Sequence, residues 1–482
     1  MQIEHAKTKT ILDWFEALSK IPRCSKNEEA IRKWLLAWSS EHGFEARTDE
    51  VGNVVIEVPA SAGLEKAPAA VIQGHMDMVC EKTKGSAHDF SRDPIKMVYT
   101  DDGWLTADGT TLGADNGIAI AMALALALDE DAAHPPLELL FTVDEETGLT
   151  GASALKPGFI KGSLLMNVDS EDEGVFTVGC AGGKDTQLAL PVELADLPAG
   201  HKALKLVAGG MSGGHSGVDI HEQRANALKM LARALLGLVD LDLRLVSLEG
   251  GTAHNAIPRD AEALIALPAS AEGDARKRIS ALDAALKKEF DKTDPKIAIE
   301  LQDGESQARA MPAAMTRKAI DFILAIPHGV AAMSKDIPGL VETSDNLATA
   351  KIEAGQLKVM TSQRSSNMDR LELLTKRIEG IARLAGGEAV SGGGYPAWQP
   401  DMSSKLLARC KSVYTELFGK QPVVEVIHAG LECGIIGSKY PGMDMISFGP
   451  TIKNPHSPDE KIDIKTIGQV WDFMVALLGS LK

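Results

Sequence analysis

The sequence predicts an α/β domain, with a mixed, largely parallel sheet flanked by helices, that is interrupted by an inserted α+β domain. Strand-like and helix-like segments alternate up to residue 184, which is typical of a parallel sheet covered by helices. From residue 185 strand-like segments follow one another directly, and after residue 390 the first pattern returns. We therefore expect residues 1–184 and 391–482 to form one domain and residues 185–390 to form a second.

Hydrophobic periodicity places the elements of the first part. They are helices over residues 11–19 and 28–40, a strand over 53–58, a strand over 69–78, a buried helix over 117–128, and strands over 137–143 and 163–169. Ligands of such sheets collect at the carboxyl ends of the strands. The polar clusters HMD, DEE and VDSE lie at or just beyond these ends, so we expect a functional site there.

The inserted part begins with the alternating segments 186–194 and 201–210 and continues with a helix over 225–239. Its expected close is the glycine-rich segment 391–400, SGGGYPAWQP, which is typical of a flexible connection between domains. A helix over 403–418, a strand over 423–427 and a C-terminal helix then complete the first domain.

Composition excludes several classes of function. The net charge is −17 and no basic block occurs, so nucleic acid or an anionic membrane would be repelled. The longest apolar run, residues 118–128, is shorter than the roughly 20 residues that cross a bilayer. Because the N-terminus lacks the pattern of a secretion signal, we expect a cytoplasmic protein.

The five cysteines, Cys24, Cys80, Cys180, Cys410 and Cys433, are scattered and form no CxxC pair. This pattern argues against a disulfide framework and against a zinc site built from cysteines. We expect all five to be reduced thiols.

Two short motifs contain candidate metal ligands. In GHMDM, His75 and Asp77 share one face of an extended chain, so the carboxylate can orient a metal-binding imidazole; a satisfied surface pair is the alternative. In LGADNG, Asp115 lies between two glycines before the buried helix, where an ordinary helix N-cap is the alternative.

Three further segments extend this set. TVDEETG places Asp144, Glu145 and Glu146 after a buried strand, where adjacent carboxylates repel one another unless cations neutralise them. Neighbouring residues of an extended chain point opposite ways, so Glu145 and Glu146 would differ in role. Asp169 follows another strand, and His456 lies in a proline-bracketed loop. A solvated acidic turn and a bystander histidine are the alternatives, but together these residues form a plausible ligand set for two divalent ions.

The sequence resembles the co-catalytic metallopeptidases that include carnosinases and bacterial aminoacyl-histidine dipeptidases. The resemblance covers nearly the whole chain. It depends on eight motifs in the family's order: GHMDMV, LGADNG, TVDEETG, NVDSED, GGHSG, GGTAHNAIP, HAGLECG and NPHSPDE.

The resemblance implies a zinc-peptidase fold in which Asp115 bridges two ions, with His75 and Asp169 completing one site and Glu146 and His456 the other. Zinc is the expected metal, with manganese or cobalt as alternatives. It also implies that Asp77 orients His75 and that Glu145 is the general base. The implied activity is hydrolysis of dipeptides, Xaa-His and β-alanyl-histidine included.

The inserted domain is then expected to act as a lid that closes over the dipeptide. The resemblance gives it the substrate-binding residues His215, Asn255 and Arg364, whose planar fork of donors suits a free carboxylate. It also implies that Gly430, in the second part of the first domain, offers backbone contacts near the site. We expect a homodimer, although an enlarged lid can replace the second subunit in some relatives. Whether His215 serves its own site or a neighbour's is therefore open.

Two other functions compete with this interpretation. A deacylase of N-acylated amino acids, or a tripeptidase, would share the motifs around the metals. A noncatalytic peptide-binding protein would share the fold but would have no need for Glu145 beside a full ligand set.

Overall fold

The computed structural model describes residues 5–335 and 337–481, and the chain divides into two compact units. Unit 1 comprises Met1–Cys180, Trp398–Val426 and Leu431–Lys482, and unit 2 comprises Ala181–Ala397 and Ile427–Gly430. The boundaries expected from the sequence, 184/185 and 390/391, fall inside strands β9 (Gly182–Pro191) and β21 (Glu388–Tyr395) of unit 2. The hydrophobic pattern changes within these two strands, so both boundaries predicted from the sequence fall a few residues inside unit 2.

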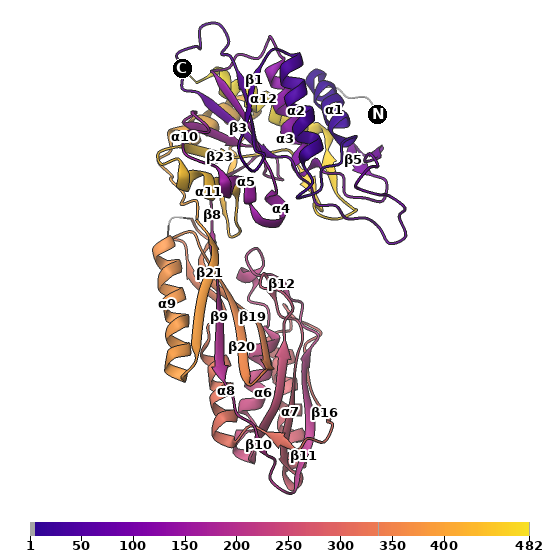
Figure 1. Ribbon diagram of the computed structural model, residues 1–482, viewed down its shortest axis with the longest axis vertical. Helices are drawn as coiled ribbons and strands as arrows, with labels where there is room; N and C mark the ends of the chain where they lie inside the picture. Colours follow the sequence, from indigo (N-terminus) through magenta and orange to yellow (C-terminus); the bar gives the residue numbers. More distant parts are fainter. Residues whose placement is uncertain (1–4, 336, 482) are drawn as a thin grey trace. The chain divides into compact units, whose positions relative to one another are not determined.

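Unit 1 contains helices and strands from both ends of the chain (Figure 1). Its helices are α1 Ala6–Ser19, α2 Glu29–Glu41, α3 Ala114–Ala127, α4 Glu145–Gly148, α5 Thr150–Ala154, α10 Lys405–Phe418, α11 Glu432–Lys439 and α12 Ile464–Gly479. Its strands are β1 Glu45–Thr48, β2 Val54–Val58, β3 Ala70–His75, β4 Met97–Tyr99, β5 Trp104–Ala107, β6 Leu137–Thr142, β7 Leu164–Asn167, β8 Val175–Cys180, β22 Val423–Ile427, β23 Asp444–Ser447, β24 Ile452–Lys453 and β25 Lys461–Asp463.

An eight-stranded sheet forms the centre of unit 1, in the order β1-β2-β6-β3-β7-β23-β8-β22. The four strands β6, β3, β7 and β23 are parallel, whereas β1, β2 and β8 pair antiparallel with their neighbours. This confirms the predicted α/β class and the mixed, largely parallel sheet. The parallel strands all end at one edge, where His75 is the last residue of β3.

Helix α3 corresponds to the longest apolar run of the sequence. Its residues are buried almost throughout, because it packs between strand β3 and helix α1. Amphipathic helices α1 and α12 pack against each other and bury one face each. No helix in the described part of the chain is long and apolar enough to cross a membrane.

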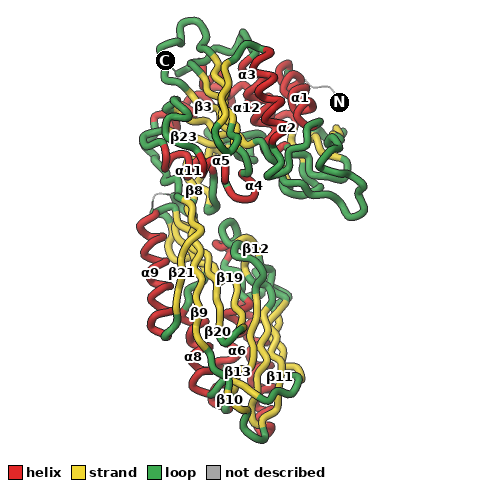
Figure 2. The backbone as a smooth tube through the Cα atoms, in the orientation of Figure 1, coloured by secondary structure: helices red, strands yellow, loops and turns green. Residues whose placement is uncertain are grey.

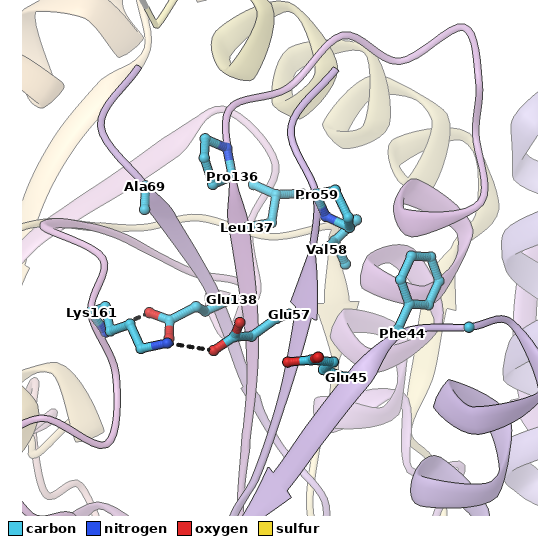
Figure 3. Close-up of a pocket in the computed structure, with 11 residues that line it drawn as sticks. Phe44, Glu45, Glu57, Val58, Pro59, Ala69, Pro136, Leu137, Glu138 and Lys161 are labelled. Carbon is cyan, nitrogen blue, oxygen red and sulfur yellow. Dashed lines mark hydrogen bonds and ion pairs between the residues drawn. The ribbon is translucent and has the colours of Figure 1, made fainter. Parts of the chain in front are cut away.

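The opposite edge of this sheet, where the parallel strands begin, has a pocket of about 420 Å³ (Figure 3). Apolar residues such as Phe44 and Leu137 line it together with the charged residues Glu57, Glu138 and Lys161. Lys161 Nζ lies 2.8 Å from Glu57 Oε1, so charges of opposite sign neutralise each other at this edge.

A disulfide joins Cys24 and Cys80, so the expectation of five reduced thiols is wrong for this pair. An isolated β-bridge pairs Cys24 with Met78, and Met78 N donates a hydrogen bond to Arg23 O at 3.1 Å. These contacts bring the segment that contains Cys24 beside the segment that contains Cys80. The Cα atoms are consequently 5.7 Å apart, within the range for a disulfide. The two cysteines are 56 positions apart and belong to no known motif, so the sequence gives no signal of their pairing.

Unit 2 consists of an antiparallel sheet with helices and several short strands (Figure 2). Its helices are α6 Ala227–Leu236, α7 Glu272–Glu289, α8 Ala313–Ala325 and α9 Met368–Ala385, with 3₁₀ turns at Ile220–Glu222, Val239–Leu241 and Ala269–Ala271. Its strands are β9 and β21, given above, and β10 Ala195–Asp196, β11 His201–Gly209, β12 Gly214–His215, β13 Arg244–Gly250, β14 Ala256–Ile257, β15 Ala261–Pro268, β16 Ala298–Asp303, β17 Arg309–Ala310, β18 Gly329–Met333, β19 Val341–Glu353 and β20 Gln356–Ser365.

The large sheet of unit 2 has nine strands in the order β16-β11-β15-β13-β19-β20-β9-β21, with β18 also paired to β19. Strand β21 includes Ser391–Tyr395, so half of the expected flexible connection is an edge strand paired with β9. Glycine content indicated a loop there, but pairing with a long neighbouring strand outweighs that local preference.

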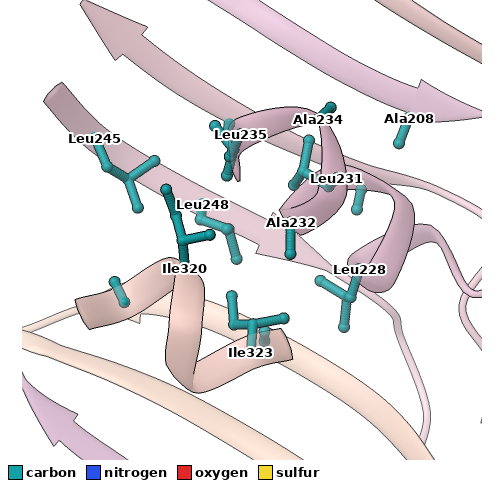
Figure 4. Close-up of a cluster of buried hydrophobic side chains, with 14 of the residues drawn as sticks. Ala208, Leu228, Leu231, Ala232, Ala234, Leu235, Leu245, Leu248, Ile320 and Ile323 are labelled. Carbon is teal, nitrogen blue, oxygen red and sulfur yellow. The ribbon is translucent and has the colours of Figure 1, made fainter. Parts of the chain in front are cut away.

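The core of unit 2 lies between its sheet and its helices (Figure 4). Leu228, Leu231 and Leu235 of α6 face Leu245 and Leu248 of β13. Helix α6 is apolar at helical spacing, and its N-terminus is capped by Asn226, which accepts from the N–H groups of Leu228 and Lys229.

Candidate metal centre

The carboxyl edge of the sheet in unit 1 gathers the five predicted ligands from five separate segments of the chain. His75 ends β3, Glu146 lies in α4 just after β6, and Asp169 lies two residues beyond β7. Asp115 is in the first turn of α3, and His456 is in the loop between β24 and β25. Parallel strands place their ends side by side, which is why residues so distant in sequence meet here.

The ligand atoms form two groups that share Asp115. In one group, His75 Nε2 lies 3.1 Å from Asp115 Oδ1 and 3.5 Å from Asp169 Oδ1. In the other, His456 Nε2 lies 3.1 Å from Asp115 Oδ2 and 3.0 Å from Glu146 Oε2. Each oxygen of the Asp115 carboxylate thus faces a different histidine, which is the arrangement a bridging ligand requires.

Asp115 does not cap helix α3, which was the alternative interpretation of this residue. Gly113 precedes the helix, with φ at 70°, and Asp115 itself has non-helical backbone angles and a cis peptide bond to Asn116. The Asp115 side chain is directed at His75 and His456 instead.

Asp77 is completely buried beside His75, with Oδ1 lying 3.2 Å from His75 Nδ1. Its carboxylate also accepts the N–H groups of Glu145 and Glu146, at 3.0 and 3.2 Å. Burial opposes the charged form, but His75 and these contacts lower the pKa of Asp77 to about 2. One carboxylate therefore holds both the imidazole and the start of α4 in place.

Glu145 and Glu146 lie in the short helix α4, so the expected extended segment is wrong at this point. Both side chains are near His75, and the ligand atoms of the three residues lie within 4.8 Å of one another. Burial raises the pKa of Glu145 well above its ordinary value, and the neighbouring carboxylates add to this. Glu146 Oε1 is buried without a hydrogen-bond partner.

The cluster has more carboxylates than histidines, and this excess of negative charge favours bound protons or cations. Hydrogen bonds to Asp115 and Glu146 raise the pKa of His456 to about 11, and burial raises that of Asp169 to about 6. Across residues 5–335 and 337–481, no lysine or arginine forms an ion pair with Asp115, Glu145, Glu146 or Asp169. Such a cluster holds protons until divalent cations replace them.

Sequence reasoning missed several residues that support the ligands. Asn116 accepts from His75 N at 3.2 Å and donates to Val168 O at 2.6 Å, which links the ends of β3 and β7. Ser25 donates to Asp77 at 2.8 Å. Fully buried Glu432 accepts from Gln73 and Thr142, and burial raises its pKa to about 7. Asn116 and Glu432 lie inside recognised motifs, whereas Ser25 has no such signal.

The four predicted substrate-binding residues lie in unit 2. Arg364 is buried near the end of β20 and donates to the Tyr395 hydroxyl at 2.7 Å. A Cβ atom on Gly430 would lie 2.7 Å from the Tyr395 ring, so Gly430, Tyr395 and Arg364 are neighbours. Asn255 is in the loop before β14, where its carbonyl accepts from Ser216 N at 2.8 Å.

His215 ends β12 and belongs to the same part of unit 2. A Cβ atom on Gly217 would meet His428 O, and would lie 3.1 Å from His215 Cε1 and 3.3 Å from Arg364 Cδ. Burial and the positive charge of Arg364 lower the pKa of His215, so its imidazole is neutral at physiological pH. His428, whose Nε2 lies 2.7 Å from Ser344 Oγ, was not among the predicted residues.

Fold and cluster together define a peptidase class: the profile of Peptidase family M20/M25/M40 matches residues 71–480, and the chain belongs to this family. Over 481 residues it is 38% identical to the cytosol non-specific dipeptidase of Escherichia coli (strain K12), with 100% of this chain and 99% of the relative covered.

Two solved structures extend the comparison. The aminoacylhistidine dipeptidase of Vibrio alginolyticus superposes with a TM-score of 0.92 at 41% identity, covering 100% of this chain and 98% of the other. Aminopeptidase PepT of Bacillus cereus ATCC 10987 superposes with a TM-score of 0.57 at 17% identity, covering 98% of each chain, and shares the fold.

Proposed function

We propose that the protein hydrolyses dipeptides, Xaa-His dipeptides such as β-alanyl-histidine among them, in a reaction that depends on two divalent ions. The relatives described as a non-specific dipeptidase and an aminoacylhistidine dipeptidase, which align over the full chain, support this substrate class. The observation that carries the proposal is the shared carboxylate of Asp115, whose two oxygens each lie 3.1 Å from a different histidine.

The residues present fit two divalent ions. His75, Asp115 and Asp169 would hold one ion, and Asp115, Glu146 and His456 the other. Nitrogen and carboxylate donors in this number suit zinc, which we propose as the metal, and manganese or cobalt would also be accepted. The buried Glu146 Oε1, without a partner, fits this assignment because a carboxylate oxygen at that depth requires a cation or a donor.

Glu145 is the proposed general base. Two bound ions would lower the pKa of a shared water and stabilise negative charge on the scissile carbonyl oxygen. Glu145 takes a proton from the attacking water and passes it to the leaving amine. The contact of its backbone N–H with Asp77 holds it beside His75.

The proposed contacts of the substrate outside the metal centre come from unit 2. Arg364 is assigned to the free carboxylate of the dipeptide, because its guanidinium is buried and oriented by Tyr395. His215, as a neutral imidazole, is assigned to the carbonyl oxygen, and Asn255 and Gly430 to the peptide backbone. These roles require unit 2 to act as a lid.

A substrate panel tests the function. Purified protein supplied with zinc, manganese or cobalt is assayed on β-alanyl-histidine, on other Xaa-His dipeptides, on dipeptides without histidine, on N-acetyl amino acids and on tripeptides. We expect the highest kcat/KM for dipeptides. Preference for N-acetyl amino acids would identify a deacylase, preference for tripeptides a tripeptidase, and absence of hydrolysis a binding protein.

We also propose a homodimer formed through unit 2. Strand β21 is at the edge of the nine-stranded sheet, and α9 packs beside it. Leu373 and Leu384 of α9 and Val390 of β21 are 71%, 92% and 72% exposed, which is unusual for large apolar side chains. Sedimentation equilibrium of the wild type and of a Leu384→Glu variant tests this, since the variant should be monomeric.

The proposed location is the cytoplasm, in line with the cytosolic description of the Escherichia coli relative. The Cys24–Cys80 disulfide is uncommon in that compartment. Because Cys180, Cys410 and Cys433 are buried, the thiol count requires cells quenched in acid and protein alkylated after denaturation. Three alkylated cysteines would then indicate that the disulfide forms in the cell, and five that it does not.

A further inference from the structure

We propose that Arg23 and Glu460 are positioning residues that hold the backbone around Asp115 and His75 in the geometry that two metal ions require. The inference rests on the proposed function, because it concerns the same metal centre. Neither residue is a metal ligand in that proposal, and both are almost completely buried, Arg23 at 2% exposure and Glu460 at 2%.

Glu460 binds the backbone of the Asp115 loop with both carboxylate oxygens. Oε2 accepts from Leu112 N at 2.7 Å and from Gly113 N at 2.9 Å, and Oε1 accepts from Asp115 N at 3.2 Å. Glu460 is also four residues beyond His456, in the same loop. One side chain therefore connects the segment of the shared ligand to the segment of a second ligand.

Arg23 binds the same loop from its carbonyl side and joins it to the His75 segment. Its Nη2 donates to Gly113 O, and its Nη1 donates to Met76 O at 3.2 Å and to Asp77 O at 2.9 Å. The planar fork of a guanidinium reaches carbonyls on two loops at once, which a lysine ammonium on its single stem cannot do in this geometry.

The glycines of LGADNG are explained by this arrangement. Gly113 has φ at 70°, and a Cβ atom there would lie 2.5 Å from Arg23 Nη2. A Cβ atom on Gly117 would lie 2.6 Å from the same nitrogen. The motif thus leaves room for a buried arginine beside the backbone that presents Asp115.

Arg23 and Glu460 consequently hold Gly113 from both sides, Arg23 at its carbonyl oxygen and Glu460 at its N–H. Both charged groups are bonded to backbone N–H or C=O groups, and these hydrogen bonds offset part of the cost of burying them. Through these contacts the backbone next to His75, Asp115 and His456 is fixed before any ion binds. Loss of such supporting contacts typically weakens metal affinity about 10- to 100-fold.

The chain offers a matched control at the other edge of the same sheet. Glu138, 4% exposed, accepts from Lys161 N at 2.6 Å and Gly162 N at 2.8 Å and pairs with Arg47 at 2.6 Å. Like Glu460, it is therefore a buried carboxylate that accepts hydrogen bonds from the N–H groups of a loop, but it lies beside the pocket of Figure 3. Its substitution tests the general effect of losing such a group.

Metal-free full-length protein is titrated with Co²⁺, and binding is measured by calorimetry and by the visible absorption of the ion. The proteins compared are the wild type, Glu460→Gln, Arg23→Lys and Glu138→Gln. A glutamine at 460 cannot accept from all three N–H groups, since one of its oxygens is replaced by a donor. We expect Glu460→Gln and Arg23→Lys to bind at least one Co²⁺ about 10- to 100-fold more weakly. We expect kcat to fall in both while KM for the dipeptide stays within about twofold.

Glu138→Gln should lose thermal stability but keep wild-type Co²⁺ affinity, absorption and kcat. Wild-type affinity and absorption in both Glu460→Gln and Arg23→Lys, or an equal loss of affinity in Glu138→Gln, would overturn the inference. If one variant does not fold by circular dichroism, the other decides. Failure of the wild type to bind two ions would instead overturn the proposed function, and the wild-type titration alone reveals that outcome.

Discussion

The two edges of the eight-stranded sheet neutralise their buried carboxylates in different ways. At the amino edge Glu138 pairs with Arg47, and Glu57 with Arg47 and Lys161. At the carboxyl edge the clustered carboxylates face two histidines, and Arg23 donates to backbone carbonyls there rather than to the ligand carboxylates. The carboxylates of the amino edge are neutralised by side chains of the protein itself. The carboxyl edge instead has the negative charge and the donor atoms to bind cations.

We therefore expect the amino edge to contribute to stability and the carboxyl edge to metal binding and catalysis. A change at the carboxyl edge should alter metal binding or turnover, and a change at the amino edge should alter only the free energy of unfolding.

Replacing the proposed base should produce the largest effect. Glu145→Gln should lower kcat by about 10²- to 10⁴-fold, because the proton of the attacking water then has no acceptor. Metal content by elemental analysis and unfolding temperature should be those of the wild type, since Glu145 is not an assigned ligand. A variant with undiminished kcat would refute the role of Glu145.

Removing the ions should destabilise unit 1 and abolish hydrolysis. Saturating zinc at about 1,000 times its Kd should raise the free energy of unfolding by about 4 kcal/mol over the chelated protein. Because the pKa of His456 is raised to about 11 and that of Asp169 to about 6, binding must displace protons. Zinc affinity, measured by calorimetry, should therefore fall as pH is lowered from about 8 to about 6. Equal unfolding temperatures with and without chelator would contradict the metal centre.

Breaking the charge network of the amino edge should affect stability alone. Arg47→Met leaves the buried Glu138 without its guanidinium and should cost about 3 kcal/mol of unfolding free energy. Denaturant unfolding measures this cost, and kcat and metal content in the folded variant should equal those of the wild type. Reduced metal content would show that the two edges are not independent.

Asp345, in the sheet of unit 2, tests a third way of neutralising a carboxyl, which is to hold a proton. Burial raises its pKa from 3.8 to about 7, although Oδ1 accepts from Gln363 Nε2 at 2.8 Å. The stability that its protonated form contributes is present below 3.8 and is lost as pH rises through about 7.

Asp345→Asn cannot lose a proton, so it should be more stable than the wild type above pH 7 by about 1–2 kcal/mol. Thermal unfolding of both proteins at about pH 5 and about pH 8 measures the difference, which should be larger at the higher pH. A difference that does not depend on pH would show that Asp345 is charged in the folded protein.

Local pattern was sufficient for much of the fold. The apolar strands before His75, Asp144 and Asp169 and the buried helix after Asp115 follow from hydrophobic periodicity, and a parallel sheet brings such strand ends together. The ends of the helices and strands were harder to predict from the sequence. Strand β21 includes glycines that indicated a loop, and Glu145 and Glu146 begin a short helix rather than extend β6.

The sequence by itself determined which residue types stand at the ends of the strands, and therefore the chemistry that His75, Asp115, Glu146, Asp169 and His456 can support. The tertiary structure alone decided that each oxygen of Asp115 faces a different histidine, that Cys24 meets Cys80 and that Arg23 and Glu460 both hold the backbone of Gly113. The physical reason is the distance along the chain over which a pattern is informative. Hydrophobic periodicity indicates which face of one segment is buried, whereas a contact between distant segments depends on how the elements between them pack.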